Sequence, residues 1–433
     1  IALSIFPPSP SLKGALAMPA VVLSAGILFV PLVRAIRRKS TILNAENIVA
    51  FGYLFWLLLD LIQGAYDIED APDWAIRDAF IAIGVSAAAM WLGAGGKAWR
   101  IPQWLTEVAS RPLTTTVIAR LVPVCFVLGM FNYAYATGFN PAVMFSYIGE
   151  QRWAAPWGRS QLGGWDAFLD QMQYFGYVLP SLTALLIARR GFTPQSWLAI
   201  VLSGIMLVFL SQGGGRRIIG VTVGAAIIAW IQSQPGITIR KFAVAAAAAV
   251  GLLTAMQFML NIRSVGYEEF AFRGGASEYD YLHVDDNFLR LAQVIELVPS
   301  QHPYVEHQQL WFTIVRPVPR VFWPGKPIDA GIDFSAAVGA KGVSLSTSII
   351  GEWYLSYGWL AVIVGGWLHG RLAKTANGLR EERFRANPIV YALAVMVLVA
   401  GMRSMQDLVI MSYALVAWWA ANRIAQARVA PTR

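Results

Sequence analysis

Cysteine, histidine and charge are all scarce in this chain of 433 residues, which contains one cysteine and four histidines. A single cysteine, Cys125, excludes an intramolecular disulfide and any cysteine-rich metal site. The histidines His283, His302, His307 and His369 are spaced too irregularly for a His–Glu zinc motif. The sequence therefore predicts neither a bound metal nor any other cofactor.

Motifs for nucleotide binding and for hydrolysis are also missing. The chain has no GxSxG nucleophile elbow, no Walker phosphate loop and no GxGxxG turn. These absences remove serine hydrolases, P-loop NTPases and dinucleotide-binding enzymes from consideration. The 34 basic residues outnumber the 25 acidic ones, but they occur in short loops rather than in a long basic stretch interleaved with aromatics. We therefore expect no nucleic-acid partner.

Hydrophobic residues are abundant. They form 57% of the chain against 14% charged residues, and the mean hydropathy is +0.53, well outside the range of soluble domains. We predict an all-α polytopic membrane protein with about eleven transmembrane helices, within a range of about ten to twelve. The expected spans are 14–33, 48–66, 75–94, 117–136, 167–188, 197–210, 218–231, 242–260, 348–369, 389–402 and 408–420.

The distribution of basic residues predicts the orientation, because positively charged loops stay cytoplasmic. The predicted cytoplasmic loops are the basic ones at 34–39, 97–111, 189–190, 240–241, 371–385 and 423–433. The chain then divides into eight spans in residues 1–260, a long non-cytoplasmic loop in 261–347 and three spans in 348–433. A loop of this length is usually functional. Asp285 and Asp286 are plausible N-caps of an amphipathic helix in it, which could act as a lid.

Six arginines fall on the predicted non-cytoplasmic side, where membrane insertion does not require them. Grouped arginines bind phosphate well, and four prolines in 316–327 would hold two of them at a fixed separation. The alternative for each arginine is contact with lipid headgroups or pairing with a nearby carboxylate. We predict a phosphate-binding site made by Arg216, Arg217, Arg263, Arg316, Arg320 and Arg403.

Two residues are candidates for proton transfer. Glu352 lies about one turn inside a predicted membrane helix, where it would act either as a general base or as a structural counter-ion. His307 is the second candidate for a base. Asp407, four residues after Arg403, is expected to form a local ion pair with it.

Four tryptophans could stack on sugar rings or anchor the protein at the membrane interface, namely Trp153, Trp157, Trp311 and Trp323.

A family resemblance rests on four segments. RPVPRVFWPGKP at 316–327, followed by GEWYLSYG at 351–358, resembles the Wzy-type O-antigen or oligosaccharide repeat-unit polymerases. GGGRR at 213–217 and RSMQD at 403–407 are similar to other basic turns of that family. The last segment departs from the family's frequent Arg-Gly-Asp-like turn, which puts the role of Asp407 in doubt. These matches cover the second half of the chain, whereas the first half agrees only in its helix pattern.

The resemblance implies a metal-independent integral-membrane glycosyltransferase with a GT-C-like helical bundle. Its substrates would be undecaprenyl-diphosphate-linked oligosaccharides, handled at the periplasmic face of the bacterial inner membrane, and a chain-length regulator could be a partner. The six arginines would bind the diphosphate and stabilise the departing charge, with Arg320, Glu352 and His307 as the catalytic candidates.

Other functions remain open at this point. An O-antigen ligase would share the arginines and differ mainly in its acceptor. A lipid-linked oligosaccharide flippase or exporter would need basic residues through the membrane, and often shows internal repeats. A non-enzymatic partner in envelope assembly would explain the long loop, but would not require arginines on four separate segments.

Overall fold

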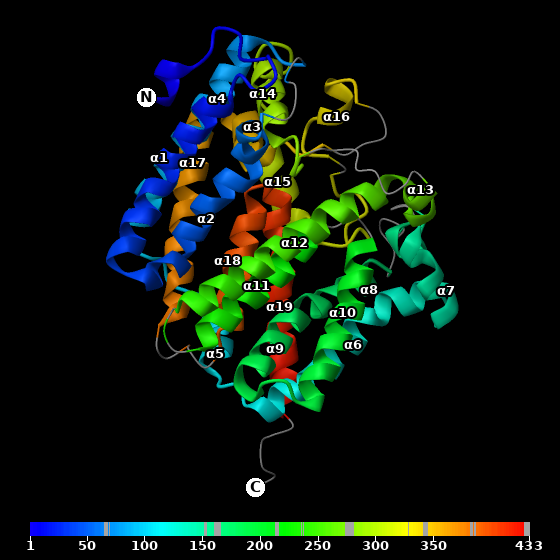
Figure 1. The fold of residues 1–433 in the computed structure, drawn as a ribbon. Coiled ribbons are helices and arrows are strands. Elements are labelled where there is room, and N and C mark those ends of the chain that lie inside the picture. The colour runs from blue at the N-terminus through cyan, green and yellow to red at the C-terminus, as the bar shows by residue number, and fades with distance from the viewer. Residues whose placement is uncertain are drawn as a thin grey trace.

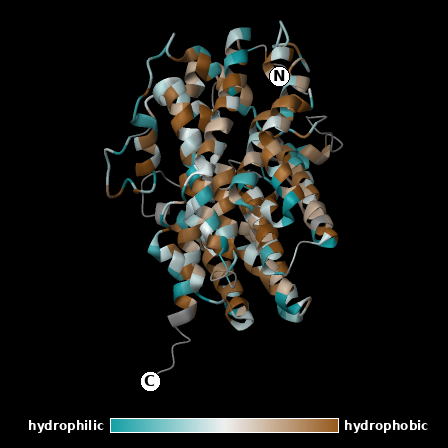
Figure 2. Ribbon diagram, turned by 90° about the vertical axis from the view of Figure 1, so that its left-hand side faces the viewer, coloured by the Kyte–Doolittle hydropathy of each residue, from teal (hydrophilic) through white to brown (hydrophobic). Residues whose placement is uncertain are grey.

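The computed structural model describes residues 1–64, 68, 70–150, 154–159, 166–212, 216–234, 236, 238–272, 281–327, 329–340, 345–381, 384 and 387–427. All regular elements in these ranges are helices, and the long ones form a bundle with the two chain termini at opposite ends (Figure 1). Hydrophobic residues run along the helices through most of the bundle (Figure 2). The protein is therefore an all-α membrane protein, as predicted.

The first half of the bundle contains α1 (Ala17–Arg37), α2 (Ala45–Tyr53), the π-helical turn η3 (Leu54–Leu58), α3 (Leu59–Ile62), α4 (Asp73–Gly95), α5 (Gln103–Ser110), α6 (Thr115–Ala136), α7 (Pro141–Ser146), α8 (Asp166–Gln171), α9 (Gln173–Arg190) and α10 (Pro194–Gln212). The second half contains α11 (Arg216–Ser233), α12 (Ile239–Val265), α13 (Tyr267–Phe272), α14 (Asn287–Leu297), α15 (Gln308–Val315), α16 (Phe334–Ala337), α17 (Ser348–Ala376), α18 (Ile389–Gly401) and α19 (Met405–Ala427). Short 3-10 turns are η1 (Ala2–Ile5), η2 (Lys39–Leu43), η4 (Tyr147–Gly149), η5 (Pro156–Arg159) and η6 (Asn377–Arg380).

Each of the eleven predicted spans overlaps a helix, although 167–188 is divided between α8 and α9. In the described part of the chain, seven helices are long and apolar enough to cross a bilayer. They are α1, α2 with η3 and α3, α4, α6, α10, α12 and α19. The apolar helices α11 and α18 are shorter, and α17 is interrupted at Tyr357 and Gly358, which leave helical geometry. Eleven crossings thus stay a prediction.

Several helices turn large apolar side chains outward. Phe29, Leu92, Val127 and Leu360 are each more than half exposed, although they lie within long helices. In water such side chains would favour aggregation, whereas in a bilayer they face hydrocarbon at no cost. The outer surface of the bundle is therefore suited to lipid.

Helices α4 and α17 approach most closely through glycines. A Cβ atom added at Gly370 would lie 1.9 Å from the carbonyl oxygen of Met90, and one added at Gly366 would lie 2.5 Å from that of Ser86. The two glycines are spaced as in a GxxxG motif, which lets helix backbones pack directly in membranes. This contact fixes the part of α17 that follows the break at Tyr357 and Gly358, whereas Glu352 lies before the break.

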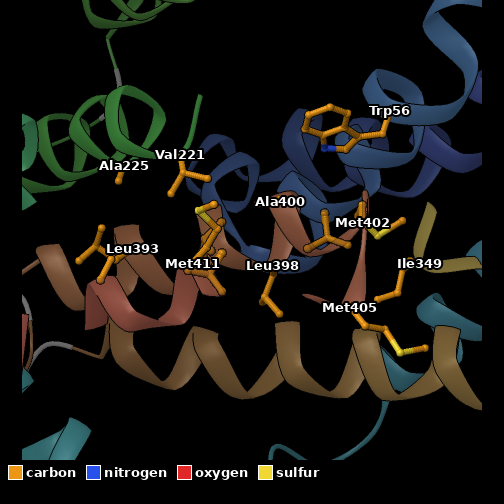
Figure 3. Close-up of a cluster of buried hydrophobic side chains, with 14 of the residues drawn as sticks. Trp56, Val221, Ala225, Ile349, Leu393, Leu398, Ala400, Met402, Met405 and Met411 are labelled. Carbon is orange, nitrogen blue, oxygen red and sulfur yellow. The ribbon is translucent and has the colours of Figure 1, made fainter. Parts of the chain in front are cut away.

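The centre of the bundle is an apolar cluster in which distant segments meet. Figure 3 shows Trp56 of η3 near α18, Val221 and Ala225 of α11 above α18, and Met411 of α19 among them. The Trp56 indole N–H donates to the carbonyl oxygen of Val399 (2.9 Å). The helices that carry the arginines therefore share one packed core.

The segment 281–297 is fixed to the first helices of the chain. Asp60 at the end of α3 accepts hydrogen bonds from the backbone N–H groups of Val284 (3.2 Å) and Asp285 (3.4 Å). Asn287 donates to the carbonyl oxygen of Trp56 (3.2 Å). Nine of the eleven residues of α14 are buried, and α14 packs against α4 and α17. The helix begins after Asp286, as predicted, but its burial makes it part of the bundle core rather than a surface lid.

The turn between α18 and α19 lies at the same end of the bundle. Ser346 donates from its hydroxyl to the carbonyl oxygen of Arg403 (2.8 Å), and the backbone N–H of Ile349 donates to that of Met402 (3.1 Å). We call this end, where residues 281–347 and the turn at 402–404 meet, the loop end. Helices α14 and α16 mark it in the upper part of Figure 1.

The predicted cytoplasmic loops gather at the opposite end. Arg34 pairs with Glu46 (3.3 Å), Arg423 pairs with Glu107 (2.8 Å), and Asn387 donates to the carbonyl oxygen of Val108 (2.9 Å). Contacts between these loops agree with the predicted division into two groups. Which group faces the cytoplasm stays a prediction.

Candidate functional site

A cationic loop, residues 316–327, follows α15 at the loop end. The Lys326 ammonium donates to the carbonyl oxygens of Arg316 and Val318, both at 2.8 Å. The Arg320 guanidinium donates to the carbonyl oxygens of Lys326 (2.8 Å) and Pro327 (2.9 Å). Two cationic side chains thus close the loop on itself. The prolines limit its backbone further, so the loop is preorganised.

These cations have no carboxylate partner among the residues that the structure describes. Within the described ranges, neither Arg316 nor Arg320 nor Lys326 forms an ion pair. Burial, followed by repulsion from Arg320, lowers the pKa of Arg316. Burial, followed by repulsion from Arg316 and Arg320, also lowers the pKa of Lys326. Three cations that repel one another in a fixed loop would be stabilised by a bound anion.

Within the described structure, the Arg316 guanidinium donates no hydrogen bond to the protein. It makes a cation–π contact with the Phe312 ring, 5.5 Å from the ring centroid. The phenols of Tyr174 and Tyr413 lie close enough to interact with its charge. Their rings, from α9 and α19, are 5.2 Å apart. Helix α15, which leads into the cationic loop, packs against α19. The loop therefore lies near a second group of charges at the start of α19.

That second group is an ion-pair network of Arg217, Asp407, Arg403 and Asp285. Asp407 is 2% exposed, and its carboxylate lies 2.9 Å from Arg217 and 3.2 Å from Arg403. Arg403 also pairs with Asp285 at 2.6 Å. Burial lowers the pKa of Arg403, but Asp285 and Asp407 outweigh it and raise that pKa above its ordinary value. The predicted Arg403–Asp407 pair is confirmed.

The six predicted arginines thus fall into different classes. Arg316 and Arg320 form no ion pair with any described residue, whereas Arg217 and Arg403 are each paired with a carboxylate, as the alternative interpretation of single arginines allowed. The side chains of Arg216 and Arg263 lie outside the described residues, as does the glycine triplet at 213–215. A phosphate site made by all six arginines therefore stays a prediction.

Glu352 caps the N-terminus of α19, the helix that carries Asp407. Its carboxylate accepts hydrogen bonds from the Ser404 hydroxyl (2.8 Å) and from the backbone N–H of Met405 (2.5 Å), the first residue of α19. A carboxylate at a helix N-terminus satisfies free N–H groups and interacts favourably with the helix dipole. Both oxygens of Glu352 are thereby engaged. The geometry favours a positioning role for Glu352 over that of a general base.

His307 lies away from the cations. His307 precedes α15 and Arg316 follows α15. The nine positions between them correspond to roughly 13 Å along the helix axis, at about 1.5 Å per residue. Its side chain is 75% exposed, and its Nδ1 lies 3.9 Å from Glu306. The structure does not bring this candidate base to the arginines.

Two of the predicted tryptophans lie beside the cationic loop. The rings of Trp311 and Trp323 are 6.2 Å apart and edge to face. Trp157 instead is buried in the bundle, where its indole N–H donates to Gln212 (3.0 Å). Trp153 lies outside the described residues. Only the first pair is placed where a sugar could meet the cations.

Sequence reasoning missed several members of this region. Lys326 was visible in the motif but was not assigned to the site, and Tyr174 and Tyr413 lie in apolar runs that gave no signal. Asp285 was assigned only to a helix cap. Among the described residues, no group of three His, Cys, Asp or Glu side chains is arranged to hold a metal ion.

Comparisons with protein-family models, with curated proteins and with solved structures find no match to this chain. The arrangement of charged side chains at the loop end is therefore the basis for a functional proposal.

Proposed function

We propose that this protein is a metal-independent integral-membrane glycosyltransferase that polymerises oligosaccharide repeat units carried on undecaprenyl diphosphate. In this proposal the bundle is GT-C-like, with about eleven spans in the bacterial inner membrane, and the loop end faces the periplasm. The observation that carries the proposal is the cationic loop, in which Arg316, Arg320 and Lys326 lack any carboxylate partner among the described residues.

The chemistry follows from the charges. An acceptor hydroxyl attacks the anomeric carbon of the donor chain, the bond from that carbon to the diphosphate oxygen breaks, and polyprenyl diphosphate leaves. Negative charge grows on the diphosphate during this step. Fixed cations stabilise such charge strongly in a site with little water, and here they take the role that a divalent metal has in other transferases. The proton of the hydroxyl goes to a base. Glu352 and His307 were the predicted bases, but Glu352 caps α19 and His307 lies away from the cations, so neither is assigned to this step.

Trp311 and Trp323 suit the sugar part of the substrate. Both lie in or next to the cationic loop, and their rings form one aromatic corner. Aromatic faces bind the apolar faces of sugar rings. A diphosphate held by the cations would place the first sugar near this corner.

Arg316→Gln is the sharpest test of the proposal. The Arg316 side chain donates no hydrogen bond to the described residues, so the substitution removes a charge and leaves the loop's own hydrogen bonds intact. Lys39→Gln is the matched control, because Lys39 is an exposed cation in η2, at the opposite end. Purified wild-type protein and both variants would be given undecaprenyl-diphosphate oligosaccharides with EDTA, and product length would be followed on gels.

We expect wild-type protein and Lys39→Gln to form ladders, and Arg316→Gln to lose activity by about a hundredfold, the effect of removing one strong charge-stabilising donor. Transfer onto lipid A core would show a ligase instead. Translocation of the lipid without any transfer would show a flippase. Equal activity of Arg316→Gln and the control would remove the support that the cationic loop provides.

A further inference from the structure

An apolar cavity of about 620 Å³ lies among α1, α2, α11, α12 and α18. Its wall is formed almost wholly by aliphatic and aromatic side chains. Only two lining residues carry a charge or an amide, Arg217 and Asn47. A cavity of this size is in the range of ligand sites, and its wall would accept hydrocarbon.

The cavity is long and narrow. Along α11 its lining runs from Arg217 to Ile231, which is fourteen residues or about 21 Å of helix. Arg217 stands at the loop end, where it pairs with Asp407. Asn47, near the start of α2, lies at the opposite end beside the contacts of Glu46 with Arg34. The cavity thus runs along the bundle, and Arg217, the one cation among the described residues that line it, lies at its loop end.

Helix α12 forms the lipid side of the cavity. It packs mainly against α11, and only 6% of the residues in its most apolar stretch are buried in the bundle. Met256 is a buried α12 residue that lines the cavity. One thin helical wall between cavity and bilayer gives a lipid chain a short path sideways into the site.

We infer that the cavity holds the polyprenyl chain of the lipid-linked substrate, with the diphosphate beside Arg217; this inference rests on the proposed function. The elongated shape suits the single methyl-branched chain of a polyprenyl lipid, whereas a bilayer phospholipid carries two chains. Arg217 at this end is paired with Asp407, so the positive charge for an anionic head comes from the cationic loop at the same end of the bundle. Helix α15, which leads into that loop, packs against α19, which carries Asp407.

The cavity would act through placement more than through affinity. A chain that moves from lipid to an apolar cavity gains little free energy, because lipid tails are as apolar as the wall. A fixed chain, however, fixes the head at its end, and positioning of this kind raises reaction rates. The test must therefore locate the chain, not only measure binding.

The experiment uses photocrosslinking in nanodiscs. The probe is a polyprenyl diphosphate with a benzophenone at the tail end, and crosslinked peptides are identified by mass spectrometry. Gly220→Leu fills the cavity from α11, where a Cβ at Gly220 meets only Met256 at 3.9 Å or more. Ala35→Trp fills it from α1. Gly204→Leu is the control, because a Cβ at Gly204 on α10 meets nothing within 4 Å. Unfolding temperatures identify any variant that fails to fold.

We expect crosslinks on the cavity walls of α1, α2 or α12, a loss of at least tenfold in either filled variant that folds, and no change in Gly204→Leu. Unlabelled undecaprenyl diphosphate should compete, and an equal amount of phosphatidylglycerol should not. Crosslinks confined to other surfaces of the wild-type protein would overturn the inference. Equal competition by phosphatidylglycerol would also overturn it, because the occupant would then be an ordinary bilayer lipid.

The two proposals can fail separately. If the protein forms polymer but crosslinks elsewhere, the cavity inference is wrong and the transferase proposal stands. If crosslinks fall in the cavity and no transfer occurs with any acceptor, the prenyl-lipid site stands and the transferase proposal is wrong.

Discussion

Asp407 offers a direct test of the ion-pair network. Its buried carboxylate contacts both Arg217 and Arg403 at the start of α19. Substitution by asparagine keeps the size of the side chain and removes its charge. The four groups of the network, two arginines and two aspartates, then change from a net charge of zero to one positive charge. We expect Asp407→Asn to destabilise the protein when no anion is bound.

The magnitude follows from what each arginine keeps. Removing one partner of a buried ion pair costs about 3–5 kcal/mol, because the other charge is left unpaired. Here Arg403 keeps Asp285 at 2.6 Å, and Arg217 is 34% exposed and so is partly solvated. Both features reduce the loss. We therefore expect a decrease in the free energy of unfolding of about 2–3 kcal/mol.

Thermal unfolding in detergent, with and without inorganic pyrophosphate, measures this effect. Asp286→Asn is the matched control, because Asp286 is 39% exposed and its contact with Arg290 is long, at 3.6 Å; such pairs contribute about 0–1 kcal/mol. Pyrophosphate should raise the unfolding temperature of Asp407→Asn more than that of wild-type protein, since the variant has one more uncompensated cation. A variant as stable as the control, or one indifferent to pyrophosphate, would refute this reasoning.

Two further predictions concern the elements that position the site. Gly370→Ala places a methyl group 1.9 Å from the backbone oxygen of Met90, so α4 and α17 must separate. We expect the free energy of unfolding, measured by thermal unfolding, to fall by about 1–3 kcal/mol. Gly26→Ala is the control and should show no loss, because the added methyl meets nothing within 4 Å. Glu352→Gln removes the carboxylate cap of α19, and we expect about 1–2 kcal/mol of destabilisation with a raised KM and an unchanged pH profile. If Glu352 is instead the base, kcat falls and the basic limb of the pH profile disappears.

The sequence predicted most of the fold because the bilayer restricts the options. A chain crossing hydrocarbon must satisfy its backbone internally, so long apolar runs become helices, and all eleven predicted runs overlap helices. The count of crossings could not be predicted with the same certainty. Helix α18 has 13 residues and α17 is interrupted at Gly358, and hydropathy does not reveal whether such elements cross.

The site was less predictable because its contacts join distant residues. The pair of Asp407 with Arg403 is local, at i and i+4, and was expected. Its second partner, Arg217, is 190 positions away, and nothing in the sequence indicates that contact. His307 shows the opposite error, since it is close to Arg316 in sequence but α15 holds the two apart. The first case depends on charge pairing between distant helices, and the second depends on the direction of α15. Composition encodes neither.

The α14 helix shows how polar residues can mislead. Its polar positions suggested an amphipathic lid, yet Asn287 and Gln293 are buried and donate to the carbonyl oxygens of Trp56 and Asp70. In a membrane protein a polar side chain on an apolar helix often satisfies a backbone group of a neighbour. Trp56 lies in the π-helical turn η3. The buried amide of Asn287 therefore donates to a backbone carbonyl in an irregular part of a helix that is distant in sequence.

The two groups of cations differ in what they can do for an anionic lipid. The four described members of the ion-pair network carry no net charge, so the network fixes α11 and α19 relative to segment 281–297 and contributes little net attraction. The cationic loop has no carboxylate partner among the described residues and supplies the attraction. Helix α15, which leads into the cationic loop, packs against α19, and Arg217 lines the apolar cavity at the same end of the bundle. A diphosphate at this end would therefore have its tail directed along the cavity and its sugars toward Trp311 and Trp323, so that one position of the head meets the needs of both chain and sugar.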